Sequence, residues 1–329
     1  MIKQLLVIGD ATIDTHIMID DASLECDFNH TNCKLCLDYA AKIPVKESFQ
    51  AVGGNGANVA IGTAKLDVST SILTSIGSDS SGELVINELK NNGVETNLTT
   101  IDTKTPTRYS TVLNFKGERT ILVYHHKRQY VWPKNEPEVD WIYFTGLSEG
   151  FENLLESLEK YLRKHPTVRL AYNPGSFQLK NSLETVREML KITDLLIVNR
   201  QEAEKILGTT LKKEKSARAL IHELINLGAQ EVVITDAASG AMAGDEENVY
   251  KMESYPVKVV AKTGAGDAFS SGYLAAKITG NDITTCLVWG IANSCSVIQQ
   301  PSSHLGLLRP MGMKKMINTF PNIKPVKVF

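Results

Sequence analysis

The stretch Lys262-Thr263-Gly264-Ala265-Gly266-Asp267-Ala268-Phe269 carries the strongest signal in this 329-residue chain. It follows a β-rich segment at residues 255–260 and opens a helical pattern, so it predicts a strand, a turn and a helix. The free backbone amides of such a turn lie at the positive end of the helix dipole and form a natural anion site. Small residues let a phosphate approach the backbone closely. Asp267 at the edge is then predicted to take a proton from a hydroxyl that attacks a bound phosphoryl group.

One other interpretation competes with this one, and two more are excluded. A plain helix N-terminus, with Asp267 complementing the dipole, is the structural alternative. A P-loop is excluded because the pattern Gly-x-x-x-x-Gly-Lys-Ser/Thr is absent, and a dinucleotide fingerprint is excluded because Phe269 replaces its third glycine.

The rest of the chain alternates short β-branched runs with helical patterns. Such alternation predicts an α/β fold in which helices cover both faces of a mostly parallel sheet, with ligands at the carboxyl ends of the strands. Strands are expected at residues 5–9, 70–75, 141–145, 168–172, 195–199 and 231–235, and helices at residues 58–66, 82–91, 152–164, 183–191, 202–207 and 217–227.

Two segments interrupt the alternation, at about residues 15–50 and 104–125. The first contains no clear helix, and the second predicts a hairpin of residues 110–115 and 119–124. Both indicate β structure outside the main layers. No internal repeat or low-complexity linker divides the chain, so we expect a single domain over residues 1–329.

Two further motifs precede the opening stretch. Gly53-Gly54-Asn55-Gly56-Ala57-Asn58 precedes a helix of small residues, and its carboxamides suit a polyhydroxylated ligand because each donates and accepts hydrogen bonds. Asn199-Arg200-Gln201-Glu202 follows a buried strand, where amide and carboxylate oxygens can organise hydrated Mg²⁺. A glycine-rich turn with an Asn cap and a capping box are the respective structural alternatives.

In combination, the three motifs resemble the ribokinase/PfkB family of ATP-dependent sugar and nucleoside kinases, over most of the chain. The resemblance implies a three-layer α/β/α ribokinase-like sandwich with a mostly parallel central sheet. The segments near 15–50 and 104–125 would form a small β lid over the acceptor, which often pairs two protomers.

The resemblance also implies roles for individual positions. Asp267 would be the catalytic base, and the amides of Gly264, Ala265 and Gly266 would form the anion hole. The acceptor would be held by Asp14, Gly54, Asn55 and Asn58. ATP and Mg²⁺ would be bound by Asn199, Glu202, Thr235, Gly240 and Asn293, the last in the adenine pocket.

The chain departs from the family pattern at two places. Ala261 stands where many relatives carry an Asp that contributes to a monovalent-cation site, which argues against activation by K⁺. Cys33-x-x-Cys36 has zinc-knuckle spacing, and Cys26 and His30 could complete four ligands. Free thiols are the alternative to this structural zinc site.

Composition narrows the partners. The formal net charge is −2, so there is no basic excess to neutralise nucleic-acid phosphates. No apolar run approaches 18 residues, so no membrane span is expected. Five cysteines without an export signal favour a reduced, cytoplasmic protein.

The sequence therefore predicts an ATP-dependent kinase that phosphorylates a hydroxymethyl group of a small sugar. A nucleoside kinase of the same family is the alternative, because lid residues Phe28, Tyr39 or Phe49 could supply a slot for the base. A phosphosugar kinase, with Arg108 as its candidate anchor, and a non-catalytic sugar- or nucleotide-binding regulator are less favoured.

Overall fold

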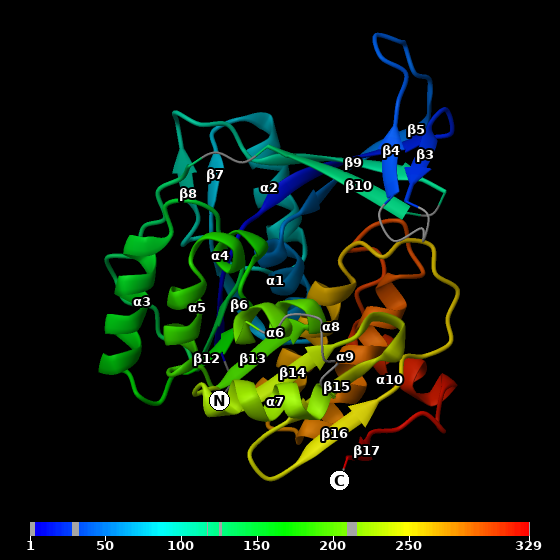
Figure 1. The fold of residues 1–329 in the computed structure, drawn as a ribbon. Helices are drawn as coiled ribbons and strands as arrows, with labels where there is room; N and C mark the ends of the chain where they lie inside the picture. The colour runs from blue at the N-terminus through cyan, green and yellow to red at the C-terminus, as the bar shows by residue number, and fades with distance from the viewer. Residues whose placement is uncertain (1–3, 28–32, 117, 125–126, 209–215, 329) are drawn as a thin grey trace.

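A nine-stranded sheet runs through the computed structural model, which describes residues 4–27, 33–116, 118–124, 127–208 and 216–328 (Figure 1). The strand order is β17-β16-β15-β14-β13-β12-β11-β1-β6. The six strands from β14 to β6 in this order pair in parallel, and β15, β16 and β17 add antiparallel pairs at the β14 edge. The bounds are β1 (Gln4–Ile8), β6 (Ser69–Leu73), β11 (Trp141–Phe144), β12 (Arg169–Tyr172), β13 (Leu195–Asn199), β14 (Glu231–Thr235), β15 (Ala241–Gly244), β16 (Val249–Met252) and β17 (Val326–Lys327).

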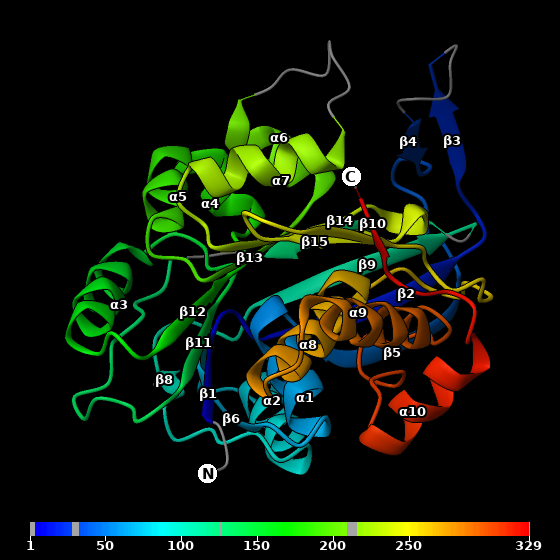
Figure 2. The same cartoon turned by 90° about the horizontal axis from the view of Figure 1, so that it is seen from below.

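Helices cover both faces of this sheet, as Figure 2 shows. Successive residues of β1 point to opposite sides, so Leu5 and Val7 belong to one hydrophobic core and Leu6 and Ile8 to the other. The first core is covered by α1 (Asn55–Lys65), α2 (Ser80–Asn91), α8 (Ala265–Ile278), α9 (Ile283–Val297) and α10 (Pro310–Thr319). The second is covered by α3 (Glu152–Lys164), α4 (Ser176–Asn181), α5 (Leu183–Leu190), α6 (Arg200–Leu207) and α7 (Ala217–Asn226). A short 3-10 turn, η1 (Ala237–Ser239), follows β14.

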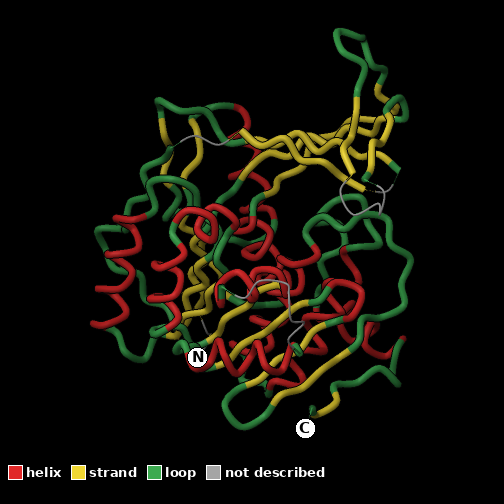
Figure 3. The backbone as a smooth tube through the Cα atoms, in the orientation of Figure 1, coloured by secondary structure: helices red, strands yellow, loops and turns green. Residues whose placement is uncertain are grey.

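A separate four-stranded sheet lies to one side of these layers (Figure 3). Its order is β10-β9-β2-β5, with β2 parallel to β9 and the outer pairs antiparallel. We call it the lid; its strands are β2 (Thr12–Ile19), β5 (Val45–Gly53), β9 (Tyr109–Phe115) and β10 (Glu118–Tyr124). Two small sheets complete the fold: β3 (Ser23–Cys26) with β4 (Cys33–Cys36), and β7 (Ser75–Gly77) with β8 (Thr100–Asp102). The lid strands therefore come from the two segments that interrupt the α/β alternation.

One expected strand is wrong. The β-rich segment at residues 255–260 forms no strand; the preceding strand, β16, ends at Met252. Pro256 lacks the N–H that a sheet ladder requires, and Tyr255 is instead buried against Phe320 with ring centroids 4.6 Å apart. The turn into α8 thus starts from a packed loop.

Among the described residues, no helix combines the length and apolar character needed to cross a membrane.

Candidate active site

The three motifs converge where the parallel strands end. Asn199 and Thr235 are paired in register at the last positions of β13 and β14. At the neighbouring helix N-termini, Nδ2 of Asn58 donates to Oδ2 of Asp267 at 2.6 Å, although 209 residues separate them. The motif at residues 53–58 and the motif at residues 262–269 therefore share one site.

The glycines of the motif at residues 53–58 let the start of α1 pack closely against the end of β1 and against β2. A Cβ at Gly53 would collide with the carboxylate of Asp14, which lies on the neighbouring strand β2. Gly54 has a φ of +91° and its Cβ would lie 2.5 Å from the carbonyl oxygen of Asp10. A Cβ at Gly56 would lie 2.6 Å from the backbone of Gly9. These contacts bring the N-terminus of α1, with exposed Asn55, against the end of β1.

Gly264 and Gly266, at the N-terminus of α8, differ in whether packing requires a glycine. Gly264 has a φ of +75°, and its Cβ would lie 2.5 Å from Cβ of Ser303. A Cβ at Gly266 would meet no protein atom within 4 Å. Packing therefore requires glycine at 264 but not at 266. The first-turn amides, from Ala265 onward, are those that an α-helix leaves without intrahelical acceptors, so they suit an anion.

Asp267 is an unusually basic carboxylate. Desolvation by the surrounding protein raises its pKa to about 7, and the charges of Glu202 and Asp14 act in the same direction. The hydrogen bond from Asn58 opposes this shift because it stabilises the ionised form. A carboxyl that titrates near neutral pH can accept and release a proton under ordinary conditions.

Asp14 forms the lid side of the site. Burial raises its pKa, while hydrogen bonds from Ser110 and Thr12 favour its ionised form. The hydroxyl of Thr12 donates to Oδ1 of Asp14 at 3.2 Å. Asp14 pairs with Ala51 on one side and Ser110 on the other, so it sits in the middle of the lid sheet.

Asn199 and Glu202 form a capping box at the start of α6. Oδ1 of Asn199 accepts from the Glu202 amide, and Oε2 of Glu202 accepts from the Asn199 amide, both at 2.9 Å. The structural alternative is therefore correct, yet it does not exclude a ligand role, since the Glu202 carboxylate interacts electrostatically with Asp267. Burial raises the pKa of Glu202.

A family model described as pfkB family carbohydrate kinase matches residues 16–308. The chain belongs to the pfkB family. It is therefore an ATP-dependent carbohydrate kinase, as the three motifs predict.

Curated relatives of different specificity are similar to this kinase. The ribokinase of Staphylococcus aureus is 23% identical over 285 residues, which cover 84% of this chain and 86% of the relative. The 5-dehydro-2-deoxygluconokinase of Bacillus subtilis is 25% identical over 296 residues, covering 82% and 89%. Among solved structures, the Arabidopsis thaliana ribokinase complexed with ribose and ATP has a TM-score of 0.79 at 20% identity and covers 96% of this chain and 99% of its own. This likeness confirms the ribokinase-like fold and its lid.

Of the five residues predicted for ATP and Mg²⁺, Thr235 and Gly240 lie at the carboxyl end of β14. Thr235 ends the strand, and Gly240, with a φ of +89°, packs so tightly on the Met252 carbonyl that only glycine fits. The prediction for Asn293 is wrong. Asn293 is 0% exposed; its Nδ2 donates to Ala268 O and Ser271 Oγ, and its Oδ1 accepts from Leu308 N. It joins α8 to α9 and cannot line an open adenine pocket.

Lys262 links the lid to the turn before α8. Its Nζ lies 2.7 Å from Oε1 of Glu118, at the start of β10. The ammonium is therefore paired with a lid carboxylate in this pfkB-family kinase.

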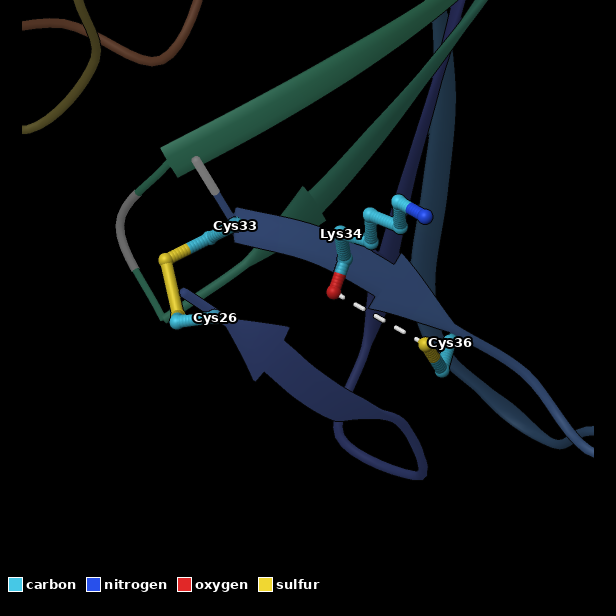
Figure 4. The surroundings of a disulfide bond; sticks show 4 residues. All are labelled: Cys26, Cys33, Lys34 and Cys36. Carbon is cyan, nitrogen blue, oxygen red and sulfur yellow. Dashed lines mark hydrogen bonds between the residues drawn. A yellow bond between two sulfur atoms is a disulfide. The ribbon is translucent and has the colours of Figure 1, made fainter. Parts of the chain in front are cut away.

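The predicted zinc site is wrong. Cys26 and Cys33 face each other across β3 and β4 and form a disulfide, so neither supplies a thiolate (Figure 4). The Cys36 thiol is free and donates to the carbonyl oxygen of Lys34. His30 lies outside the described residues. Within the described part of the chain, no group of three or more His, Cys, Asp or Glu side chains is arranged to hold a metal ion.

The sequence did not indicate that the loop between α9 and α10 reaches the site. Ser303 Oγ lies 3.2 Å and His304 Nε2 lies 2.7 Å from Oδ1 of Asn58. Nothing local marks these residues, because a serine and a histidine in a loop match no motif.

Proposed function

We propose that this kinase transfers the γ-phosphoryl group of ATP to a hydroxymethyl group of a small sugar. The single observation that carries the proposal is the contact between Asn58 and Asp267, which joins the family's acceptor motif to a carboxylate whose pKa is raised to about 7. A base held beside an acceptor-binding amide, at a helix N-terminus suited to an anion, has the parts that phosphoryl transfer to an alcohol needs.

In this mechanism Asp267 accepts the proton of the acceptor hydroxyl as its oxygen attacks the γ-phosphorus in line. The amides of Gly264, Ala265 and Gly266 bind the transferring phosphoryl oxygens, whose charge they match at the helix N-terminus. Asp14, Gly54, Asn55 and Asn58 hold the acceptor. The lid excludes water, which limits wasteful hydrolysis of ATP.

The nucleotide would lie along the carboxyl ends of β13 and β14, against Thr235 and Gly240. Mg²⁺ binds in proteins to hard oxygen ligands and keeps several of its waters. The donors here fit that chemistry, since Asn199 and Glu202 offer amide and carboxylate oxygens. Asn199 Oδ1 and Glu202 Oε2 each accept one backbone hydrogen bond in the capping box, and Oε1 of Glu202 lies outside it. When bound, the ion would neutralise phosphate charge. The sequence argument against a K⁺ requirement, from Ala261, stays a prediction.

A nucleoside is the second candidate acceptor, and one contact favours it. His16 and Phe49 stack with ring centroids 4.7 Å apart and planes 5° from parallel. They are paired in register two positions along the lid from Asp14 and Ala51, so they share a face with Asp14. His16 is buried and Phe49 is half-buried, so the Phe49 ring is the one that could support a base. Tyr39 is fully exposed, and Phe28 lies outside the described residues.

A phosphosugar is disfavoured by the position of Arg108. This side chain is 1% exposed, and its Nη1 donates to Asp10 and to the hydroxyl of Tyr130. Arg108 therefore makes its hydrogen bonds inside the protein and is not placed to bind the phosphate of a phosphosugar.

The acceptor class is tested by measuring ADP formation with pentoses, hexoses, nucleosides and sugar phosphates, each at equal concentration with ATP and Mg²⁺. We expect the highest kcat/KM with a free sugar, and phosphate on its hydroxymethyl oxygen in the product. A preference for nucleosides of tenfold or more would replace the sugar proposal with the second candidate.

A homodimer formed through the lid completes the proposal. The expectation that all five cysteines are reduced is wrong, because Cys26 and Cys33 form a disulfide. The proposed cytoplasmic location therefore rests on the pfkB family and not on the cysteines.

A further inference from the structure

A chain of hydrogen bonds reaches the proposed base from the loop between α9 and α10. His304 is 6% exposed, and its Nε2 lies 2.7 Å from Oδ1 of Asn58. An amide oxygen can only accept, so Nε2 is the donor. Nδ2 of Asn58 then donates to Oδ2 of Asp267 at 2.6 Å. The imidazole, the amide and the carboxylate therefore form one continuous chain across three segments of the sequence.

The imidazole is itself held in place. Its Nδ1 lies 3.8 Å from Oε1 of Glu88 in α2, which is longer than a hydrogen bond, and the two groups form an ion pair only when both ring nitrogens carry a proton. Its backbone oxygen accepts from Nζ of Lys65 in α1 at 3.0 Å. Lys65 thus anchors the backbone of His304, and Glu88 of a second helix faces its ring.

Fixing the ring matters because a carboxamide has two orientations of nearly equal shape. In the orientation seen here, the N–H group of Asn58 faces Asp267. In the reverse orientation, its carbonyl oxygen would face a carboxylate, and two acceptors repel each other. Ser303 Oγ also contacts Oδ1 at 3.2 Å, but a hydroxyl donates or accepts equally well and so does not select the orientation. A ring N–H at Nε2 selects it.

We propose that His304 is a positioning residue that orients the Asn58 amide, so that this amide donates to Asp267 and holds the carboxylate for proton transfer. The inference rests on the proposed role of Asp267 as the base.

A matched pair of amide substitutions tests it. In His304→Gln, Nε2 stands the same number of bonds from Cα as Nε2 of histidine, so the donor to Asn58 is kept. In His304→Asn, the amide nitrogen replaces Nδ1 and that donor is lost. We expect His304→Gln to keep kcat within about threefold, and His304→Asn to lower kcat by roughly 10- to 100-fold with an unchanged KM for ATP.

The pH profile separates positioning from general structural damage. Loss of a hydrogen bond to an ionised carboxylate raises its pKa, so the acid limb of kcat/KM should move up by about one pH unit in His304→Asn only. The charged groups that face Asp267 and His304 are Glu202, Asp14, Glu88 and Lys65. All four are present in both variants, so the comparison between the variants is controlled. His304→Leu is a second variant, to be used if His304→Asn does not fold. A leucine side chain needs no hydrogen-bond partner when buried, and we expect the same loss of kcat from it.

Equal kcat and equal acid limbs in folded His304→Asn or His304→Leu and in wild type would overturn the inference. Equal losses in the Gln and Asn variants would overturn it as well. Neither result touches the role of Asp267 as the base, which is tested separately by the turnover of Asp267→Asn and by the pH profile of the wild-type enzyme.

Discussion

Asp267 combines a location at a helix N-terminus with a pKa raised to about 7 by desolvation and by two neighbouring carboxylates. A free aspartate titrates near 3.9. The base must be deprotonated to act, so activity belongs to the pH range above its pKa and is lost as pH falls through it. We predict that kcat/KM falls about tenfold per pH unit below pH 7. A profile that stays flat down to pH 5 in steady-state assays would contradict this assignment.

At this scale the sequence predicted the residues with a local signature and missed those without one. Asp267 and Gly264 lie in one short motif, and their placement follows from a turn entering a helix. His304 meets Asn58 across 246 residues, a contact that no local spacing encodes. Asn293 was misplaced because its helix, α9, is apolar nearly all round, so a polar residue there can face inward as well as toward a ligand.

At the scale of elements, the turn into α8 contains one glycine that packing requires, Gly264, and one that only a ligand would require, Gly266. We predict that Gly264→Ala lowers the free energy of unfolding by about 1–3 kcal/mol, because φ is +75° and Ser303 is in contact. Gly266→Ala should change it by less than about 0.5 kcal/mol.

The matched alanine at 266 should nonetheless lower kcat by roughly 10- to 100-fold, since its methyl group would stand where the phosphoryl group approaches. Denaturant unfolding and steady-state kinetics on both variants measure the contrast. Full activity in Gly266→Ala would show that the anion does not bind over this turn.

The elements themselves were predictable where periodicity was strong. Six parallel strands and six helices lie near the expected residues, because alternating buried runs and amphipathic helices follow from the sequence alone. The expected strand at residues 255–260 failed because a β-branched run can also pack as a loop once proline removes a ladder donor. The disulfide between Cys26 and Cys33 depends on the register of β3 with β4, which the cysteine spacing does not reveal.

At the scale of the whole molecule, the lid has an open edge. Every residue of β10 is exposed, and Ile121, Leu122, Val123 and Tyr124 are 42–58% exposed. An apolar edge strand of this kind is a template for pairing with another chain. We therefore predict a dimer in solution that Leu122→Lys or Val123→Lys shifts to monomer, while Met311→Lys, at an 84% exposed position on α10, does not.

Sedimentation equilibrium across micromolar concentrations measures this distribution. A wild-type protein that remains monomeric throughout would remove the lid-mediated dimer from the account.

The most direct test of the central claim, that Asp267 is the base of a phosphoryl transfer, is the turnover of Asp267→Asn measured together with nucleotide binding. The substitution keeps the size of the side chain and removes its capacity to accept the proton. We predict that kcat falls by roughly 10²–10⁴-fold, while calorimetry gives an ATP dissociation constant within about twofold of wild type, because the substitution leaves Thr235, Gly240 and the backbone amides at the N-terminus of α8 in place. Near-wild-type turnover in the folded variant would contradict it.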